Sequence, residues 1–304
     1  MPHIPVLYHE VIHALNPHDG GLYIDGTVGA GGHAWGILDH SSPSGILLGL
    51  DLDPIALSLA KEHLSMFADR VILRQASYTT ISQQIEDLAW NKIDGILLDL
   101  GVSSMQLDDR SRGFSFLGDA PLDMRFNPEG LVTAADLVNG LPETKLADLI
   151  YRYGEERKSR RIAKAIVGSR PIHTTAELAH IISQVVERGK DGIHPATRTF
   201  QALRIATNDE LQNLKQVLPQ AVASLAPGGR VAVIAFHSLE DRIVKEYFRQ
   251  ESQDCICPPK QPICTCGHKA ILRKITRRPI RPEGIELENN PRARSSRLRI
   301  AEKI

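Results

Sequence analysis

Apolar and polar positions alternate in blocks along the first hundred residues of the chain. Four short apolar runs, each about the length of a buried strand, are bounded by turn residues. They span residues 22–25, 45–51, 71–75 and 93–100. Segments of helix length, such as residues 54–67, lie between most of them. Strands that alternate with helices predict an α/β fold with a parallel sheet, in which ligands bind at the carboxyl ends of the strands.

The alternation stops after Leu100. The sequence that follows has helical periodicity in three places, at residues 142–153, 155–167 and 175–188. Thr174 and Glu177 form a capping-box pattern ahead of the third segment. We therefore predict a helical domain, residues 107–205, inserted into a sheet domain made of residues 1–106 and 206–304.

Beyond the insertion, a helix is expected over residues 208–225, ending at the turn 227–229. An apolar run over residues 230–236 then predicts a fifth strand of the same sheet. The sheet domain would thus be assembled from both ends of the chain.

Composition supports a soluble enzyme-sized chain. It has 304 residues, 42% of them hydrophobic, which is enough to bury the core of one large domain or two. We find no apolar run near the ~20 residues of a membrane span, and no signal peptide at the N-terminus. The expected location is the cytoplasm, with no membrane partner.

Charge is unevenly distributed, although the formal net charge is zero. Residues 269–299 contain ten Lys or Arg against three Glu, and residues 152–170 contain seven against two. Two basic tracts in a neutral protein indicate a polyanionic partner. The alternative is that each tract is only a solvated face, as basic helices often are.

The first sixty residues, by contrast, contain no Lys or Arg. They hold a glycine-rich turn from Asp25 to His33, and Asp51 follows at a second strand end. Gly29, Gly31 and Ala34 match the dinucleotide fingerprint, so an NAD-dependent oxidoreductase is one interpretation. A pyrophosphate would lie among acids without a nearby cation, whereas the sulfonium and ammonium of S-adenosylmethionine would be attracted. A simple strand-to-helix turn is the third alternative.

Four chemically versatile residues are expected at strand ends: Asp25, Asp51, Asp99 and His237. Asp99 is followed by small polar residues, and an acceptor there suits methylation of an exocyclic amine, whose protons must be held while its lone pair is freed. Asp99 could instead bind a cofactor or cap the next turn. We take Asp99 and His237 as candidate catalytic residues.

Three polar clusters are dense enough to note as further candidates: residues 121–125, 194–198 and 237–242. Single members of such clusters are more often core histidines or ion-pair partners.

All four cysteines occur as two C-x-C pairs, Cys255 with Cys257 and Cys264 with Cys266. Disulfides are not expected in the cytosol, and four paired thiols are similar to a tetrahedral zinc site. The C-x-C spacing is tighter than the usual zinc knuckle. Zinc ligands and free thiols in a loop remain equal alternatives, and no metal is assigned at this point.

Several longer motifs together are similar to one family. They are residues 5–7, 25–33, 97–108, 112–116, 121–125, 194–204, 227–230, 236–242 and 290–299. In this order they resemble the bacterial 16S rRNA (cytosine1402-N4)-methyltransferases over nearly the whole chain. The resemblance implies a class I methyltransferase sheet, which is Rossmann-like, with an inserted helical domain.

The same resemblance implies a set of S-adenosylmethionine contacts: Gly31, Gly32, His33, Asp51, Tyr78, Asp99 and Gln106. The chain departs from the family at Met105, where proline is usual, and at Tyr78, where phenylalanine is common. Neither change removes a polar contact.

The expected activity is therefore transfer of a methyl group from S-adenosylmethionine to N4 of a cytidine in 16S rRNA, within the small ribosomal subunit or its precursor. An NAD-dependent oxidoreductase and a non-catalytic RNA-binding protein are the rival interpretations. The sequence does not predict the oligomeric state.

Overall fold

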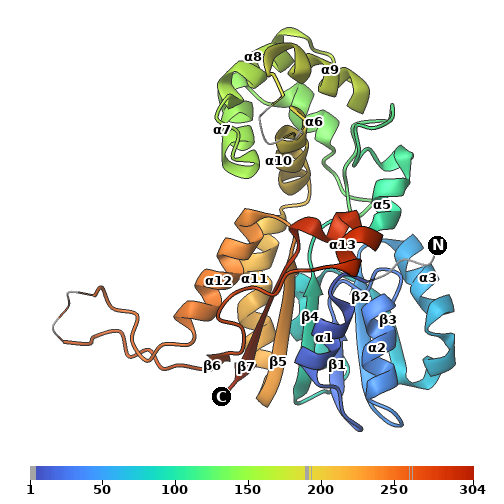
Figure 1. The fold of residues 1–304 in the computed structure, drawn as a ribbon, viewed down its shortest axis with the longest axis vertical. Coiled ribbons are helices and arrows are strands. Elements are labelled where there is room, and N and C mark those ends of the chain that lie inside the picture. The colour runs from blue at the N-terminus through green and yellow to red at the C-terminus, as the bar shows by residue number, and fades with distance from the viewer. Residues whose placement is uncertain (1–4, 189–191, 193, 260, 262) are drawn as a thin grey trace. The chain divides into compact units, whose positions relative to one another are not determined.

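The computed structural model describes residues 5–188, 192, 194–259, 261 and 263–304. Its chain forms two compact units, one made of residues 1–101 with 211–304 and the other of residues 102–210. The domain bounds expected from the sequence, 1–106 with 206–304 and 107–205, stay a prediction. Figure 1 labels the elements of both units.

The first unit is built on a seven-stranded sheet with the order β3-β2-β1-β4-β5-β7-β6. The five strands from β3 to β5 are parallel, and β7 and β6 are antiparallel to their neighbours. Their bounds are β1 Leu22–Asp25, β2 Ile46–Asp51, β3 Val71–Gln75, β4 Ile93–Asp99, β5 Leu225–Ala235, β6 Leu272–Lys274 and β7 Arg297–Lys303. The predicted α/β class I methyltransferase sheet is confirmed.

Successive strand residues bury their side chains on opposite faces of this sheet, as the period of two requires. On β1, Tyr23 joins one core and Ile24 the other; on β5, Ala232 and Val233 divide in the same way. Apolar residues on both faces need cover on both faces, which explains the uninterrupted apolar runs of the sequence.

Helices supply that cover. The first core contains residues of α1 (Tyr8–Leu15), α2 (Gly32–His40) and α3 (Pro54–His63). The second contains residues of α4 (Ile81–Asp87), α11 (Glu210–Ser224) and α12 (Ser238–Gln250). Figure 1 shows α11 and α12 beside β5. Shorter pieces complete the unit: η1 (Ser65–Arg70), η2 (Tyr78–Thr80), α13 (Ile285–Asn289) and η4 (Pro291–Ser295).

The C-terminal strand β7 was not predicted, because its arginines made it look like part of a basic tract. Leu298 and Ile300 are buried on it, and β7 pairs with β5 from Arg230↔Glu302 to Ala235↔Arg297. The fifth strand also begins earlier than expected, at Leu225. A register shift between Ile93 and Gly95 of β4 accommodates this extension, which contains the turn-like residues 227–229.

The second unit is helical around a separate core. Its elements are α5 (Ser104–Asp108), η3 (Arg110–Arg112), α6 (Ala134–Gly140), α7 (Glu143–Gly154), α8 (Ser159–Gly168), α9 (Thr175–Val185) and α10 (Thr197–Thr207). The capping box of Thr174 and Glu177 is present at the start of α9, as predicted. Helices α6 and α10 were missed. No helix in the described part of the chain is long and apolar enough to cross a membrane.

Candidate active site

Three acidic residues end three neighbouring strands of the first unit. Asp25 ends β1, Asp51 ends β2 and Asp99 ends β4, and β1 lies between the other two in the sheet. All three strands run in the same direction, so their carboxyl ends form one edge of the sheet. We call Asp25, Asp51 and Asp99 the acidic edge.

The glycine-rich turn connects this edge to helix α2. Gly29 and Gly31 have φ angles of 52° and 84°, in the left-handed region that favours glycine. At Gly32, an added Cβ would come within 2.4 Å of the ring of Pro5. The turn therefore needs glycine for two separate reasons, backbone conformation and close packing.

Asp51 holds the turn in place through its carboxylate. Its Oδ2 accepts a hydrogen bond of 2.9 Å from the backbone N–H of Gly29, and its Oδ1 accepts one of 2.9 Å from the N–H of Asp53. Asp53 in turn caps helix α3 by accepting from Ile55. The backbone N–H of Leu52 is also directed at this carboxylate. A carboxylate has about four acceptor sites, so one is left for a ribose hydroxyl.

Burial makes ionisation of the acidic edge costly. It raises the pKa of Asp25 to about 7, with a further upward push from the charge of Asp51. Burial likewise raises the pKa of Asp51, and raises that of Asp99 well above its ordinary value, where Asp25 and Glu240 add repulsion. A site whose acids resist ionisation when empty gains most from a bound cation.

Asp99 has an unusual set of neighbours. Its backbone N–H donates to Thr27 Oγ1 at 2.7 Å, and its Oδ2 lies 3.8 Å from Nδ1 of His33. His33 Nε2 lies 2.9 Å from the carbonyl of Val6, and because a carbonyl only accepts, Nε2 carries the proton. Oδ1 of Asp99 is buried without a hydrogen-bond partner in the described part of the protein. An orphaned carboxyl oxygen at a strand end is the kind of group a ligand would satisfy.

Tyr78 lies beside the same edge, on η2 after strand β3. It packs against the second core, and its Cβ lies 3.1 Å from where a Cβ of Gly26 would be. The structure thus brings Gly31, Gly32, His33, Asp51, Tyr78 and Asp99 together in one unit, around the ends of β1, β2 and β4.

His237 begins helix α12 and caps it. Its Nδ1 accepts from the backbone N–H of Glu240 at 3.4 Å, and its Nε2 lies 3.2 Å from Glu240 Oε1. Glu240 also accepts from the backbone N–H of Phe236 at 2.8 Å. These contacts are structural. They also position Glu240, whose negative charge raises the pKa of Asp99. Neither Glu240 nor Thr27 was foreseen as a site residue, since the sequence marks one as part of a cluster and the other as part of a turn.

Gln106 belongs to the second unit. It is buried and forms a capping box with Ser103: its Oε1 accepts from the N–H of Ser103 at 3.1 Å, and its own N–H donates to Ser103 Oγ at 3.2 Å. Its predicted contact with the cofactor stays a prediction.

The other dense polar clusters have structural explanations. Asp123 and Arg125 form a bidentate ion pair, with N–O distances of 2.8 and 2.7 Å. His194 stacks on Phe116, with ring centroids 4.6 Å apart, and its Nδ1 accepts from the N–H of Ala196. Arg198 lies 3.7 Å from Glu156. These contacts organise the helical unit.

A cavity of about 910 Å³ lies in the first unit, between α1, the start of α2 and residues 279–290. It is lined by Tyr8, Trp35 and Arg281 among others, and it shares Gly32 with the predicted cofactor contacts. Asp51, Tyr78 and Asp99 do not line it. We therefore place the candidate site at the acidic edge, where the carboxyl groups with raised pKa values lie. The cavity adjoins this site at Gly32.

The two basic tracts differ in how much charge they leave exposed. Helix α8 buries Ile162 and Ala163 and exposes Arg160, Arg161 and Lys164. In residues 269–299, by contrast, part of the charge is used internally. Arg299 donates to Asp241 at 2.6 and 3.2 Å, and Arg297 donates to the same carboxylate at 3.2 Å. Arg277 and Arg278 are exposed.

Comparison with known proteins identifies the family. Residues 1–304 match the model of the MraW methylase family. The chain is 51% identical to "Ribosomal RNA small subunit methyltransferase H" of Heliobacterium mobile and 52% identical to the protein of that name from Geobacter sulfurreducens, with 99% of both chains covered in each case.

Solved structures are more distant. An rRNA methylase from Streptococcus thermophilus superposes with a TM-score of 0.44 and 10% identity, over 98% of this chain and 93% of that one. A likeness this distant does not bear on function. The whole chain matches the model of a methylase family, so the interpretation as an NAD-dependent oxidoreductase is wrong. The chain belongs to the MraW methylase family.

Proposed function

We propose that this protein uses S-adenosylmethionine to methylate N4 of cytidine 1402 in the 16S rRNA of the small ribosomal subunit. The observation that carries the proposal is the acidic edge beside a glycine-rich turn, in a methylase-family chain that shares half its residues with small-subunit rRNA methyltransferases. The reaction class follows from the family, and we propose residues for each part of the reaction.

The residues around the edge fit the methyl donor. S-adenosylmethionine supplies a methyl group on a positively charged sulfur. Gly31 and Gly32 let the ligand approach the backbone, and Asp51 has an acceptor site left for a ribose hydroxyl. Burial raises the pKa of Asp25 and of Asp99, and the positive charges of a bound sulfonium and ammonium would favour their ionised forms. His33, Tyr78 and Gln106 complete the proposed set.

Asp99 is the proposed catalytic residue. The N4 amine of cytosine is a poor nucleophile because its lone pair is delocalised into the ring, and an acceptor for its protons helps to free that pair. Asp99 Oδ1, buried and without a partner in the described structure, can accept such a bond. The alternative that Asp99 binds the methyl donor remains open. We keep His237 in the site as a positioning residue that acts through Glu240.

RNA binding is assigned to the basic surfaces. A base must leave its stack to reach a pocket at the ends of the strands, so the protein must hold the flanking backbone. The predicted inserted domain, residues 107–205, is the proposed substrate-recognition domain, because α8 exposes Arg160, Arg161 and Lys164; Arg277 and Arg278 add a second basic patch. The proposed setting is the cytoplasm, on the small subunit or its precursor.

Mass spectrometry of rRNA nucleosides tests this function. Small subunits from cells that lack the protein should carry no N4-methylcytidine at the target. Incubation with purified protein and S-adenosylmethionine should restore it, and the variant Asp99→Asn should not. The proposal would be contradicted if other proteins without this one restored N4-methylcytidine at the target, or if the purified protein methylated a different nucleotide.

A further inference from the structure

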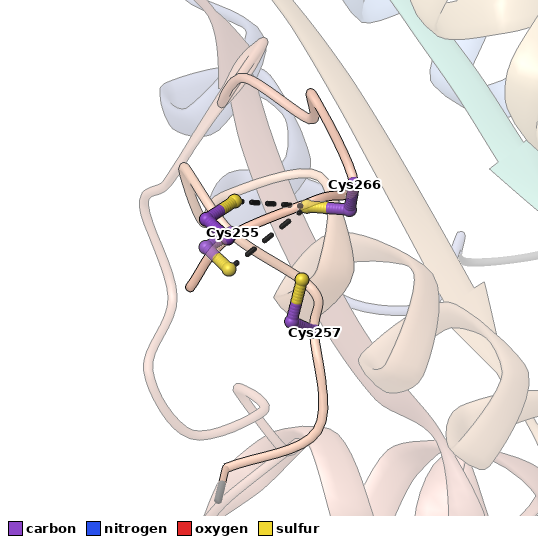
Figure 2. A group of neighbouring side chains, drawn as sticks. Cys255, Cys257 and Cys266 are labelled. Carbon is purple, nitrogen blue, oxygen red and sulfur yellow. Dashed lines mark hydrogen bonds between the residues drawn. The ribbon is translucent and has the colours of Figure 1, made fainter. Parts of the chain in front are cut away.

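The four cysteines meet at one point of the first unit. Their side chains come from the segment between α12 and β6, and all four sulfur atoms lie within 4.8 Å of one another. The Sγ atoms of Cys264 and Cys266 are 3.6 Å apart, and those of Cys266 and Cys255 are 3.9 Å apart. Figure 2 shows the side chains of Cys255, Cys257 and Cys266 converging, with dashed lines from Cys266 to two of its neighbours.

These separations match metal ligands and not disulfides. A disulfide places its sulfurs about 2.05 Å apart, and all four cysteines here are free. Four sulfurs at the corners of a tetrahedron, each about 2.3 Å from a central zinc ion, lie about 3.8 Å from one another. The observed separations of 3.6 and 3.9 Å bracket that value.

The backbone around the sulfurs also suits bound thiolates. The N–H of Ile256 donates to Sγ of Cys266 at 3.5 Å. Backbone N–H groups of Thr265 and His268 are directed at the sulfurs of Cys257 and Cys266 respectively. Such bonds spread the negative charge that four thiolates bring to a divalent cation.

Apart from the cysteines, few side chains in the described part of the segment between α12 and β6 are packed. Ile256 and Ile263 are 42% and 74% exposed, so these two side chains of the described part of the segment form no apolar core. Its base is closed by Nδ1 of His268, 2.8 Å from the carbonyl of Gln253, and by the N–H of Ala270, which donates to Asp254. Beyond that base, the sulfur cluster joins the two arms, and near the tip Gln261 Nε2 donates to Thr265 Oγ1 at 2.8 Å and to the carbonyl of Ile263 at 3.0 Å. Connections of this length without secondary structure are uncommon in compact domains unless something binds them.

We propose that Cys255, Cys257, Cys264 and Cys266 bind one zinc ion, which fixes the segment between α12 and β6. Four soft thiolates in tetrahedral array select zinc among the common divalent ions. With all four positions taken by protein, the ion is structural and has no role in methyl transfer. The structure thereby separates the two alternatives that the sequence left equal.

Thiol counting on the purified protein is a direct test, because the chain has no other cysteine. The protein should contain about one zinc per chain, and its four thiols should react slowly with a thiol reagent. A strong chelator should release the zinc and expose all four thiols together. Four thiols that react at once in protein reloaded with zinc would overturn the proposal.

Substitutions locate the ion. The double variant Cys257→Ser with Cys266→Ser should lose zinc, and Ile256→Ala should keep it, because Ile256 contributes its backbone N–H and its side chain is exposed. Cobalt(II) in place of zinc should give the intense visible spectrum of a tetrahedral thiolate site in Ile256→Ala and not in the double variant.

Methyl-donor binding checks that each variant is folded. It should be unchanged in both, since the cysteines take no part in the acidic edge. Zinc retained by the folded double variant would assign the metal to other residues and refute the proposal.

Discussion

The acidic edge and the basic surfaces of this protein use charge in opposite ways. Asp25 is buried and Asp51 and Asp99 are partly buried, and this burial makes ionisation of their carboxyl groups costly. The arginines of α8 and Arg277 with Arg278 stand in solvent. Buried charge is worth several kcal/mol and depends on geometry, whereas exposed charge is weaker and is screened by salt. The proposed function thus assigns a small cation and a polyanion to separate residues of one neutral chain.

The largest expected effect is at the acidic edge. Asp99→Asn keeps the size of the side chain and removes its charge, so methyl transfer should fall by about 10²-fold or more. Calorimetry with S-adenosylmethionine then separates two roles. A parallel loss of affinity makes Asp99 a donor-binding residue, and intact affinity makes it the acceptor for the cytosine amine.

Asp94→Asn is the matched control for this change, since Asp94 lies on the same strand and accepts a hydrogen bond from Leu22. It should leave transfer nearly unchanged. Near-normal methylation by folded Asp99→Asn would return Asp99 to the role of a strand-end acid.

A smaller loss is expected when Asp51 is removed. Asp51→Ala should weaken binding of S-adenosylmethionine by roughly 1.5–3 kcal/mol, the scale of hydrogen bonds to a charged group. Part of this loss would come from the turn, because Asp51 also accepts from the N–H of Gly29. Analogues of S-adenosylmethionine that lack the 2′- or 3′-hydroxyl separate the ribose contribution from that of the turn. Wild type should bind these analogues more weakly than S-adenosylmethionine, whereas Asp51→Ala should bind the analogues and S-adenosylmethionine about equally. A variant that still discriminates would exclude Asp51 as the ribose acceptor.

The raised pKa of Asp25 predicts a pH dependence of binding. A cation binds best when the edge is ionised, so affinity for S-adenosylmethionine should rise about tenfold between about pH 6 and pH 8, as a group with a pKa of about 7 loses its proton. S-adenosylhomocysteine, whose sulfur is neutral, should show a smaller rise. Asp25→Asn should flatten the curve, and equal curves for both ligands would show that the sulfonium does not sense this edge.

The same titration affects stability with a definite sign. The folded protein without ligand keeps the proton of Asp25 at pH values where the unfolded chain has lost it. Its free energy of unfolding should therefore fall as the pH rises from about 4 toward about 7, and Asp25→Asn should remove that part of the decline. Urea unfolding at several pH values measures it.

The exposed charges should give the smallest and most salt-dependent effect. Replacing Arg277 and Arg278 by alanine should flatten the salt dependence of RNA binding by about two contacts, each about 0.7–0.9 in the slope of log K against log salt. Affinity for the methyl donor should hardly change. Lys92 is exposed and lies outside both basic tracts, so Lys92→Ala is the control. An unaltered slope would leave the two arginines as solvated surface, and the same experiment on Arg160 and Arg161 would test α8.

The sequence predicted the parallel part of the fold well, because buried parallel strands are continuous apolar runs. The bounds of β1 and β3 agree with those expected, and α3 and α11 lie within the segments, residues 54–67 and 208–225, where helices were predicted. It failed at β7, where Arg297 and Arg299 occupy alternate positions of a strand. Their ion pairs with Asp241, fifty-odd residues earlier in the chain, are not visible in a local pattern.

The candidate site was predicted in part for a similar reason. Acids at strand ends are marked by the strands before them, so Asp25, Asp51 and Asp99 could be found. The dependence of Asp99 on Thr27 and Glu240 could not, because it arises when three segments of the chain meet in space. Cysteine spacing left zinc undecided, since ligation depends on where the sulfurs come together and not on how many residues separate them.

The pairing of β4 with β5 has a consequence for how the chain is made. Partners such as Asp99 and Ile234 are more than a hundred residues apart, and the whole helical unit is synthesised between them. During translation β4 must wait as an unpaired edge until the insertion has emerged, a state prone to aggregation. The separate core of the insertion allows it to fold first and shorten the loop that β5 must close. A chain interrupted within the insertion would expose that edge, so premature termination there should yield insoluble product.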